Sequence, residues 1–297
     1  MSQHDHFTAL CVEELLKRRL PDGGFALYEK ESHRPDPTAW AIMALDAADA
    51  DGDIVKQARG RLAADQHEDG RVSVFRPFAA AFWPTSLAVL AWQGAREFQQ
   101  FQNPAIDFLL ETTGTHDQPD PAWQGHDTTI LAWPWIEGTH SWAEPTALAL
   151  LALKTAGCEE HRRVREAIRM AMDRQLPGGG WNYGNTVIFG KKLRPTPNAT
   201  GMLLHTLSGV VEQNRVQASI DYLHTRVPGV RTPLSLGWAL LGLGSWAGYP
   251  PDGRSWLMEC LERQDYYGSY DTCQISLLLL AYLSGDGHEG IGKNMGG

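Results

Sequence analysis

The sequence predicts an all-α protein: a single α/α toroid (an α6/α6 barrel) whose six helix pairs form an inner and an outer ring. Two observations predict this fold. A helix start, usually Pro-Thr followed by an apolar run, recurs at Pro37, Pro84, Pro145, Pro197, Pro233 and Asp271. A glycine-containing turn precedes most of these starts. Because two-helix units bury their apolar faces only by stacking, we expect one closed stack, with an open solenoid as the alternative.

The first helix of each pair is amphipathic. In the segment 53–65, Ile54, Ala58 and Leu62 fall on one stripe, and the charged residues lie elsewhere. Such a helix belongs on the outside of the ring. The second helices, such as 145–153, have almost no charged residues, which predicts burial on most sides and a place in the inner ring.

The turn after the outer helix follows a template of a polar residue, a glycine four positions later and an aromatic or branched residue two beyond. It is met by Arg19, Gly23 and Phe25; by Gln66, Gly70 and Val72; by Gln175, Gly179 and Trp181; and by Gln264, Gly268 and Tyr270. A glycine there takes the left-handed conformation that ends a helix. The third repeat is irregular, and we place its turn at 121–125.

The loops that lead into the inner helices are longer in repeats one to four than in repeats five and six. In a ring these loops rise over one mouth, at the N-termini of the inner helices, where the partial positive charges of the helix ends converge. We therefore expect the functional site at this mouth. The toroid is expected to span 1–285, and the Gly-rich segment 286–297 to form a flexible tail.

The composition excludes several classes of protein. A net charge of −9 argues against nucleic acid as a partner. The N-terminus lacks the pattern of a secretory signal, and the longest apolar run, 277–283, is far shorter than the ~20 residues of a transmembrane helix. The four cysteines show no paired or metal-finger spacing. We expect a cytoplasmic protein.

The turn at 175–181 (Gln-Leu-Pro-Gly-Gly-Gly-Trp) and the helix at 145–153 (Pro-Thr-Ala-Leu-Ala-Leu-Leu-Ala-Leu) resemble the repeats of the prenyltransferase and squalene-cyclase superfamily. The hallmark of that superfamily is a Gln…Gly-x-Trp turn between paired helices, and the resemblance covers nearly the whole chain. It implies an α/α toroid that acts on isoprenoids, and it leaves open whether this chain is a cyclase, a prenyltransferase or a protein without activity.

Class II cyclases of this superfamily protonate an alkene with the middle acid of Asp-x-Asp-Asp. The segment 34–38 resembles this motif and keeps the middle acid as Asp36, without the flanking acids. The segment 125–129 resembles an Asp-x-Asp-Thr-Thr variant through Asp127. Asp271 and Cys273 resemble half of the zinc site of the protein prenyltransferases. We expect no cofactor, with zinc at Asp271 and Cys273 as the alternative.

Glu144 is the acid that capping explains least. It directly precedes Pro145, and a residue before proline avoids helical angles, so we expect a non-helical residue at the mouth. An acid beside tryptophans could have a raised pKa and serve as a proton donor. The alternative for Asp36 is an ordinary helix cap.

Aromatic and basic residues complete the expected site. Trp40, Trp83 and Trp238 at inner-helix starts, and Trp133, Trp135 and Trp142 before Glu144, are candidates for lining a central cavity, with turn packing as the alternative. The loop cations Arg34, Arg76, Lys192 and Arg194 are candidates for gripping a diphosphate or carboxylate, with solvated surface charge as the alternative.

These candidates lead to one main hypothesis. We expect a terpenoid cyclase-like enzyme that acts on an isoprenoid or other long apolar substrate by proton transfer, in a central aromatic-lined cavity, with Glu144 or Asp36 as the donor. One alternative is a toroid that binds lipid or a partner without catalysis. A second is zinc-dependent prenyl transfer. Polysaccharide-cleaving enzymes also use α/α toroids, although the Gln…Gly-x-Trp turns favour the isoprenoid enzymes.

Overall fold

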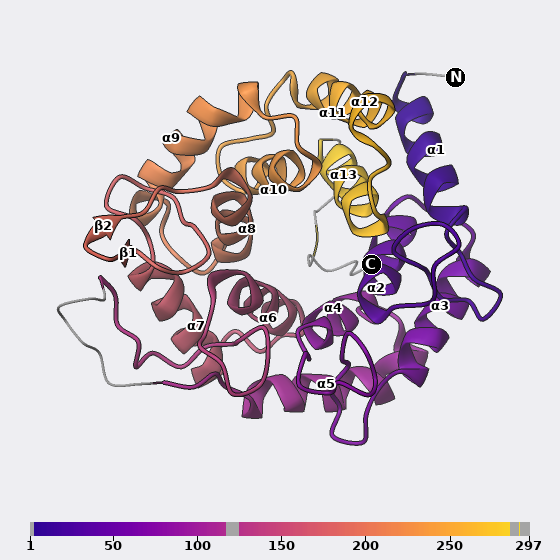
Figure 1. The fold of residues 1–297 in the computed structure, drawn as a ribbon, viewed down its shortest axis with the longest axis horizontal. Helices are drawn as coiled ribbons and strands as arrows, with labels where there is room; N and C mark the ends of the chain where they lie inside the picture. The colour runs from indigo at the N-terminus through magenta and orange to yellow at the C-terminus, as the bar shows by residue number, and fades with distance from the viewer. Residues whose placement is uncertain (1–2, 117–124, 286–290, 292–297) are drawn as a thin grey trace.

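The computed structural model describes residues 3–116, 125–285 and 291, and the paired helices close into a ring (Figure 1). The inner ring contains α2 (Pro35–Ala47), α4 (Pro84–Ala91), α6 (Ala143–Thr155), α8 (Pro197–Leu207), α10 (Pro233–Gly244) and α13 (Thr272–Ser284). The outer ring contains α1 (Gln3–Leu16), α3 (Gly52–Ala64), α5 (Gln99–Glu111), α7 (Arg162–Asp173), α9 (Gln217–Arg226) and α11 (Gly253–Glu262). The predicted α/α toroid is confirmed.

The remaining elements are short. They are α12 (Gln264–Tyr267), the 3-10 helices η1 (Arg96–Phe98), η2 (Gln213–Arg215) and η3 (Val227–Gly229), and the strands β1 (Val187–Ile188) and β2 (Lys191–Lys192). The two strands pair antiparallel, with Val187 opposite Lys192, in the loop that leads into α8. This hairpin lies over the outer part of the ring, near α7 and α9 (Figure 1).

The ring closes where the last inner helix meets the first repeat. Helix α13 packs against α2 and α1. The backbone N–H of Thr272 donates to Leu27 O at 3.0 Å, and the Thr272 hydroxyl donates to Ala26 O at 2.6 Å. The buried Arg18 donates to Tyr270 O at 2.8 Å. These contacts between the two ends of the chain exclude the open solenoid.

The polarity of each helix decides its ring. Every residue of α4 is buried, in keeping with its lack of charge. In α7 the buried residues include Val164, Ala167 and Met170, at the spacing of one helical face, while most of its charged residues lie toward solvent. Burial of apolar surface by stacked pairs therefore holds the two rings together.

The recurring threonine ties each loop to its inner helix. Thr38, Thr85, Thr146 and Thr200 accept hydrogen bonds through Oγ1 from the backbone N–H groups of Phe25, Val72, Trp133 and Trp181, at 2.9, 2.9, 3.2 and 3.0 Å. Each of these threonines is buried. A buried N–H needs a partner, so the hydroxyl has a structural reason to recur at the start of four inner helices.

The turn glycines are required by conformation and by space. Gly23, Gly70, Gly179 and Gly268 have φ values of 88°, 89°, 86° and 94°, as the turn template predicts. A Cβ at Gly70 would lie 2.1 Å from Pro104 O, and one at Gly179 would lie 2.3 Å from Ala218 O. These two turns therefore press on the outer helix of the next repeat.

The third repeat uses an aromatic residue that the template places elsewhere. Trp133 occupies the position that Trp181 has in the fourth repeat: its backbone N–H donates to Thr146, and its indole N–H donates to Leu109 O at 3.0 Å. The Trp181 indole donates to Ala171 O in the same manner. The expected turn at 121–125 lies outside the described residues except for Gly125.

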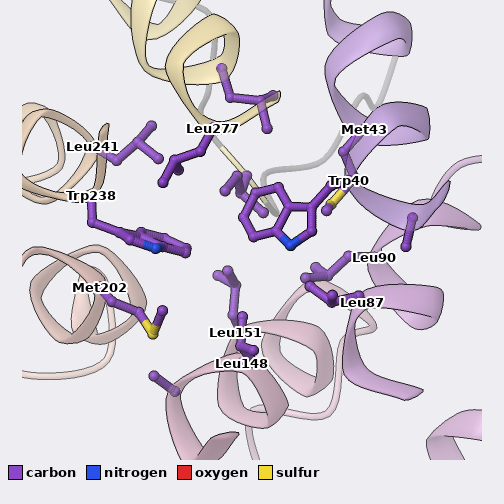
Figure 2. Packing of buried hydrophobic residues seen from close by; sticks show 14 of the residues in the cluster. Trp40, Met43, Leu87, Leu90, Leu148, Leu151, Met202, Trp238, Leu241 and Leu277 are labelled. Atoms are coloured by element: carbon purple, nitrogen blue, oxygen red, sulfur yellow. The ribbon is translucent and has the colours of Figure 1, made fainter. Parts of the chain in front are cut away.

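Large side chains from opposite parts of the inner ring meet at its centre (Figure 2). The rings of Trp40 on α2 and Trp238 on α10 lie 5.9 Å apart, edge to face, and they are 8% and 1% exposed. The expectation that these two tryptophans line an open central cavity is wrong at this level of the ring. Their side chains fill the space between the helices instead.

The expected flexible tail, 286–297, lies outside the described residues except for Ile291. Ile291 is buried, and its carbonyl oxygen accepts a hydrogen bond from His205 Nε2 at 2.8 Å. His205 is near the C-terminus of α8, so this contact is at the end of the ring opposite the mouth. Within the described part of the chain, no helix is long and apolar enough to cross a membrane.

Candidate functional site

The mouth of the toroid is bordered by the first inward-facing residue of each inner helix. Figure 2 labels Trp40, Leu87, Leu148, Met202, Trp238 and Leu277 around the centre of the ring. Residues four positions earlier lie on the same helix face, one turn closer to the mouth. These residues, called the mouth ring below, are Asp36, Trp83, Glu144, Asn198, Leu234 and Cys273.

Glu144 lies in the first turn of α6, so the expectation of a non-helical residue is wrong. A residue before proline is accommodated there, in the first turn of the helix. The Glu144 carboxylate oxygen Oε1 accepts a hydrogen bond from Asn198 Nδ2 at 3.1 Å, across the gap between α6 and α8. Burial raises the pKa of the Glu144 carboxyl, and the hydrogen bond from Asn198 lowers it in part. Among the described residues, no cation pairs with Glu144.

Asp36 has a different environment. It is 3% exposed, and Arg34 donates to both of its carboxylate oxygens, from Nε at 3.0 Å and from Nη2 at 2.7 Å. Burial raises the pKa of Asp36, and the Arg34 guanidinium opposes that rise. The cap of α2 is Arg34, so Asp36 is not the helix cap that the sequence offered as its alternative role. Arg34 is bound to Asp36, so its guanidinium is not available to bind a substrate.

Cys273 and Asp271 lie beside Asp36 across the seam of the ring. Asp271 caps α13: its Oδ1 accepts from Gln274 N at 2.8 Å, while Gln274 Oε1 accepts from Asp271 N at 3.0 Å. Burial, with the charges of Asp36 and Asp271, raises the pKa of the Cys273 thiol well above its usual range. The thiol is therefore the favoured form, and zinc binding at Cys273 would have to release its proton. Within the described residues, no group of three or more His, Cys, Asp or Glu is placed to hold a metal ion.

The tryptophans expected at the site separate into different roles. Trp83 of the mouth ring and Trp135 form an edge-to-face pair with ring centroids 5.4 Å apart, and both are partly exposed. Trp142 directly precedes α6 and is partly exposed. Trp133 is 1% exposed and packs in the core, so its expected contact with a substrate is wrong.

Asp127 lies away from the mouth ring, on the loop that packs against α7. Its Oδ1 accepts from the backbone N–H and the hydroxyl of Thr129, at 2.9 and 2.6 Å, and its Oδ2 lies 3.1 Å from Arg169. The hydrogen bonds from Thr129 lower the pKa of Asp127. A lowered pKa favours the ionised carboxyl, which is a poor proton donor. This argues against the predicted role of Asp127 as the catalytic acid.

The other loop cations do not converge on Glu144. Arg76 is exposed, and its Nη1 donates to Ala64 O at 3.2 Å, at the C-terminal end of α3. Lys192 and Arg194 are exposed in and after strand β2. These positions are typical of surface loop charges.

The sequence did not indicate Asn198 as a site residue. Asn198 stands two residues before Thr200, just as Asp36 and Glu144 stand two residues before Thr38 and Thr146. An alignment of the repeats on the tied threonine would have placed it in the mouth ring. Its partner was not predictable from the repeat alone, because the contact depends on how α6 and α8 pack.

Comparisons with known proteins show the fold. No protein-family model and no curated protein matches the chain. Among solved structures, a protein from Actinoplanes is 14% identical, with a TM-score of 0.62 over 96% of this chain and all of that one. An inactive variant of the α-1,6-mannanase GH76A from Salegentibacter, in complex with α-1,6-mannotriose, is 11% identical, with a TM-score of 0.66 over 95% of this chain and 99% of that one.

The type II terpene cyclase MstE from Scytonema is also similar. It is 17% identical, with a TM-score of 0.53 over 94% of this chain and 81% of that one. At these identities the likeness concerns the architecture alone. The chain is therefore an α/α toroid of the kind found in both a terpene cyclase and a glycan-cleaving enzyme.

Proposed function

We propose that the protein is an enzyme in which Glu144 starts the reaction by donating a proton to an apolar, isoprenoid-type substrate at the mouth of the toroid, as a terpenoid cyclase does. One observation carries the proposal: Glu144 is a half-buried acid with a raised pKa whose described partner is a neutral amide, Asn198. A proton donor needs a pKa shifted toward working pH, and burial without a cationic partner shifts the pKa of a carboxyl in that direction.

The proposed first step is a proton transfer that leaves a carbocation on the substrate. The proton of the Glu144 carboxyl moves to one alkene carbon, the π electron pair forms the new C–H bond, and the other carbon becomes a carbocation. Glu144 is left as a carboxylate, which Asn198 stabilises by the hydrogen bond to Oε1. The exposed faces of the Trp83 and Trp135 pair are suited to stabilising a cation nearby. Loss of a proton from the substrate cation to water ends the reaction, and water restores the acid.

Cleavage of an oligosaccharide is the second candidate, because the similar mannanase binds α-1,6-mannotriose. Glycoside hydrolysis uses two carboxyl groups, about 5 to 9.5 Å apart, on either side of the scissile bond. The other acid of the mouth ring, Asp36, has both oxygens bound by Arg34. The inactive mannanase variant is substituted at two adjacent aspartates, and this sequence contains no Asp-Asp pair. An acid with a raised pKa whose described partner is an amide fits protonation of an alkene better.

The test compares the wild type with Glu144→Gln, which keeps the shape and removes the acid. Glu137→Gln is the matched control, because Glu137 is on the loop that leads into α6, is 60% exposed and pairs with Arg71. Each protein is incubated with geranylgeranyl diphosphate, squalene and α-1,6-mannotriose, and the products are analysed by mass spectrometry. We expect turnover of an isoprenoid by the wild type and by Glu137→Gln, and a loss of at least about 100-fold in Glu144→Gln.

Other results of this experiment would support a different function. Cleavage of mannotriose that is lost in Glu144→Gln would establish the second candidate. Binding of an isoprenoid without turnover, with equal affinity in both proteins, would replace the enzyme by a binding protein. If neither isoprenoid binds or reacts, the proposal is wrong.

A further inference from the structure

A cavity of about 290 Å³ lies apart from the mouth ring, between the loops that lead into α6 and α8. Its volume is at the lower end of the range of small-molecule sites. The residues that line it include the polar His116, His126 and Ser141 and, from the β-hairpin, Ile188 and Phe189. Arg174, which follows α7, and Trp142 line it as well, with Thr115, Thr128, His140, Asn185 and Val187. The cavity thus has a polar part and an apolar part.

Arg174 is the only arginine, lysine or acid among the described lining residues, and it is 5% exposed. Its Nη1 donates to Gly184 O, its Nη2 lies 3.3 Å from Asp127 O, and its Nε lies 3.3 Å from Asp173 Oδ2. A guanidinium has five N–H groups, so these contacts leave one N–H on each terminal nitrogen. Two such groups in one plane match the two oxygens of a carboxylate.

Ser141 supplies an independent sign of a ligand. It is 8% exposed and lines the cavity, and its hydroxyl has no hydrogen-bond partner in the described part of the structure. Buried hydroxyl groups are normally paired, because an unpaired one loses the hydrogen bonds that it makes to water. Because the Oγ atom itself is buried, a bound acceptor would supply the missing partner after the Ser141 side chain changes rotamer.

The histidines add neutral donors to the same wall. Burial, with the charge of Arg174, lowers the pKa of His126 to about 4. Burial is also the main cause that lowers the pKa of His116. The described contact of His126 joins Nδ1 to Thr186 Oγ1 at 3.5 Å, which leaves Nε2 for a ligand. Among the described lining residues there is no carboxylate, in a chain whose net charge is −9.

The apolar wall is partly open. Phe189 is 84% exposed and Ile188 is 40% exposed, next to the half-buried Trp142. Phe189 has a φ of 49°, a left-handed conformation that is uncommon for a residue with a large side chain. Exposed aromatic and aliphatic groups beside a cavity favour a ligand with an apolar body.

We propose that this cavity is a binding site for a small carboxylate with an aromatic or branched aliphatic body. Arg174, Ser141 and His126 hold the carboxylate, and Trp142, Ile188 and Phe189 cover the body. Glu144 is not among the lining residues, so binding is measured here directly and without turnover.

The experiment is isothermal titration calorimetry of the full chain with benzoate, benzamide and inorganic phosphate. Benzamide keeps the body without the charge, and phosphate keeps a charge without the body. We expect benzoate to bind at least about 10-fold more tightly than either, since a charge-assisted hydrogen-bond pair is worth about that factor. Equal affinity for benzamide and benzoate, or no binding of benzoate up to about 10 mM, would overturn the proposal.

Variants locate the site. Ser141→Ala and Phe189→Ala are each expected to weaken benzoate binding by about 5- to 10-fold. The matched control is Phe75→Ala, which removes a 64% exposed phenylalanine from the second loop, outside the cavity, and should leave the affinity unchanged. Arg174→Lys keeps the charge and loses the paired geometry, so it should weaken binding as well. Benzoate that binds equally to Ser141→Ala, Phe189→Ala and the wild type binds elsewhere, which rejects this site.

Discussion

At the scale of single residues, two acids in equivalent positions of the repeat have opposite environments. Asp36 and Glu144 both lie in the first turn of an inner helix, two residues before the tied threonine. Asp36 faces a guanidinium that binds both of its oxygens, whereas Glu144 faces the amide of Asn198. A guanidinium stabilises the carboxylate, and an amide donor stabilises it far less. This difference favours Glu144 over Asp36 as the proposed proton donor.

Burial raises the pKa of the Glu144 carboxyl, and the hydrogen bond from Asn198 opposes that rise. Because that bond lowers the pKa of Glu144, Asn198→Ala should raise the pKa further. Activity that needs the protonated acid is lost as pH rises through this pKa, so the alkaline limb of the pH–rate profile should move to higher pH in the variant. Asn198→Asp adds a negative neighbour and should move it further. A profile that keeps its midpoint in both variants would show that Glu144 is not the titrating donor.

The raised pKa of Glu144 should also make the free energy of unfolding depend on pH. Its pKa is raised in the folded state, so the folded protein holds the proton at pH values where the unfolded chain has released it. This contribution to stability is fully present below the unfolded value and is lost as pH rises through the folded value. Unfolding in urea should therefore show a smaller fall in stability from pH 4 to pH 8 for Glu144→Gln than for the wild type. Parallel curves would mean that the pKa of Glu144 is not raised.

At the scale of elements, the threonine tie is the device that positions each loop. Thr146→Val should leave the buried N–H of Trp133 without its partner, at a cost of about 1–3 kcal/mol. Thr146→Ser keeps the hydroxyl and should lose less. Chemical denaturation measures both. A larger loss in Thr146→Ser than in Thr146→Val would show that the methyl packing of Thr146, more than its hydroxyl, stabilises the loop.

The helices were predictable because their signals are local. Proline at an inner-helix start, glycine after an outer helix and polarity on one face act within a few residues. The role of Trp133 in the third repeat was missed because the segment before it lacks the template glycine, and its hydrogen bonds to Thr146 and Leu109 mark that role. The same limit applies to the site: Glu144 was visible as an acid without a capping role, but its partner Asn198 belongs to another helix.

The tryptophans show a second limit of sequence reasoning. Helical spacing correctly directed Trp40 and Trp238 toward the centre of the ring (Figure 2). It carried no information on the distance between α2 and α10, which brings the two rings to 5.9 Å. Whether an inward aromatic lines a cavity or fills it depends on that distance.

At the scale of the whole molecule, the ring is closed by a few contacts between distant parts of the chain. Thr272→Val removes a buried hydroxyl that bonds to Ala26 O and should destabilise the entire ring. Thr206→Val is the control, because Thr206 is also buried but its hydroxyl bonds within its own helix, to Met202 O. We expect one cooperative thermal transition in all three proteins, with the largest fall in midpoint for Thr272→Val. Separate transitions of different repeats would indicate that the stack is not closed in solution.

The closed ring leaves the mouth as the face on which Glu144 is reached, since Trp40 and Trp238 fill the centre beneath it. The proposed reaction therefore requires Glu144 to donate a proton to a substrate carbon at this face. The most direct test is turnover of the isoprenoid substrates in D₂O, with products analysed by mass spectrometry. Donation by Glu144 predicts a product that carries a new C–D bond in the wild type and in Glu137→Gln, and almost none in Glu144→Gln. Deuterated product formed equally fast by Glu144→Gln would contradict the account.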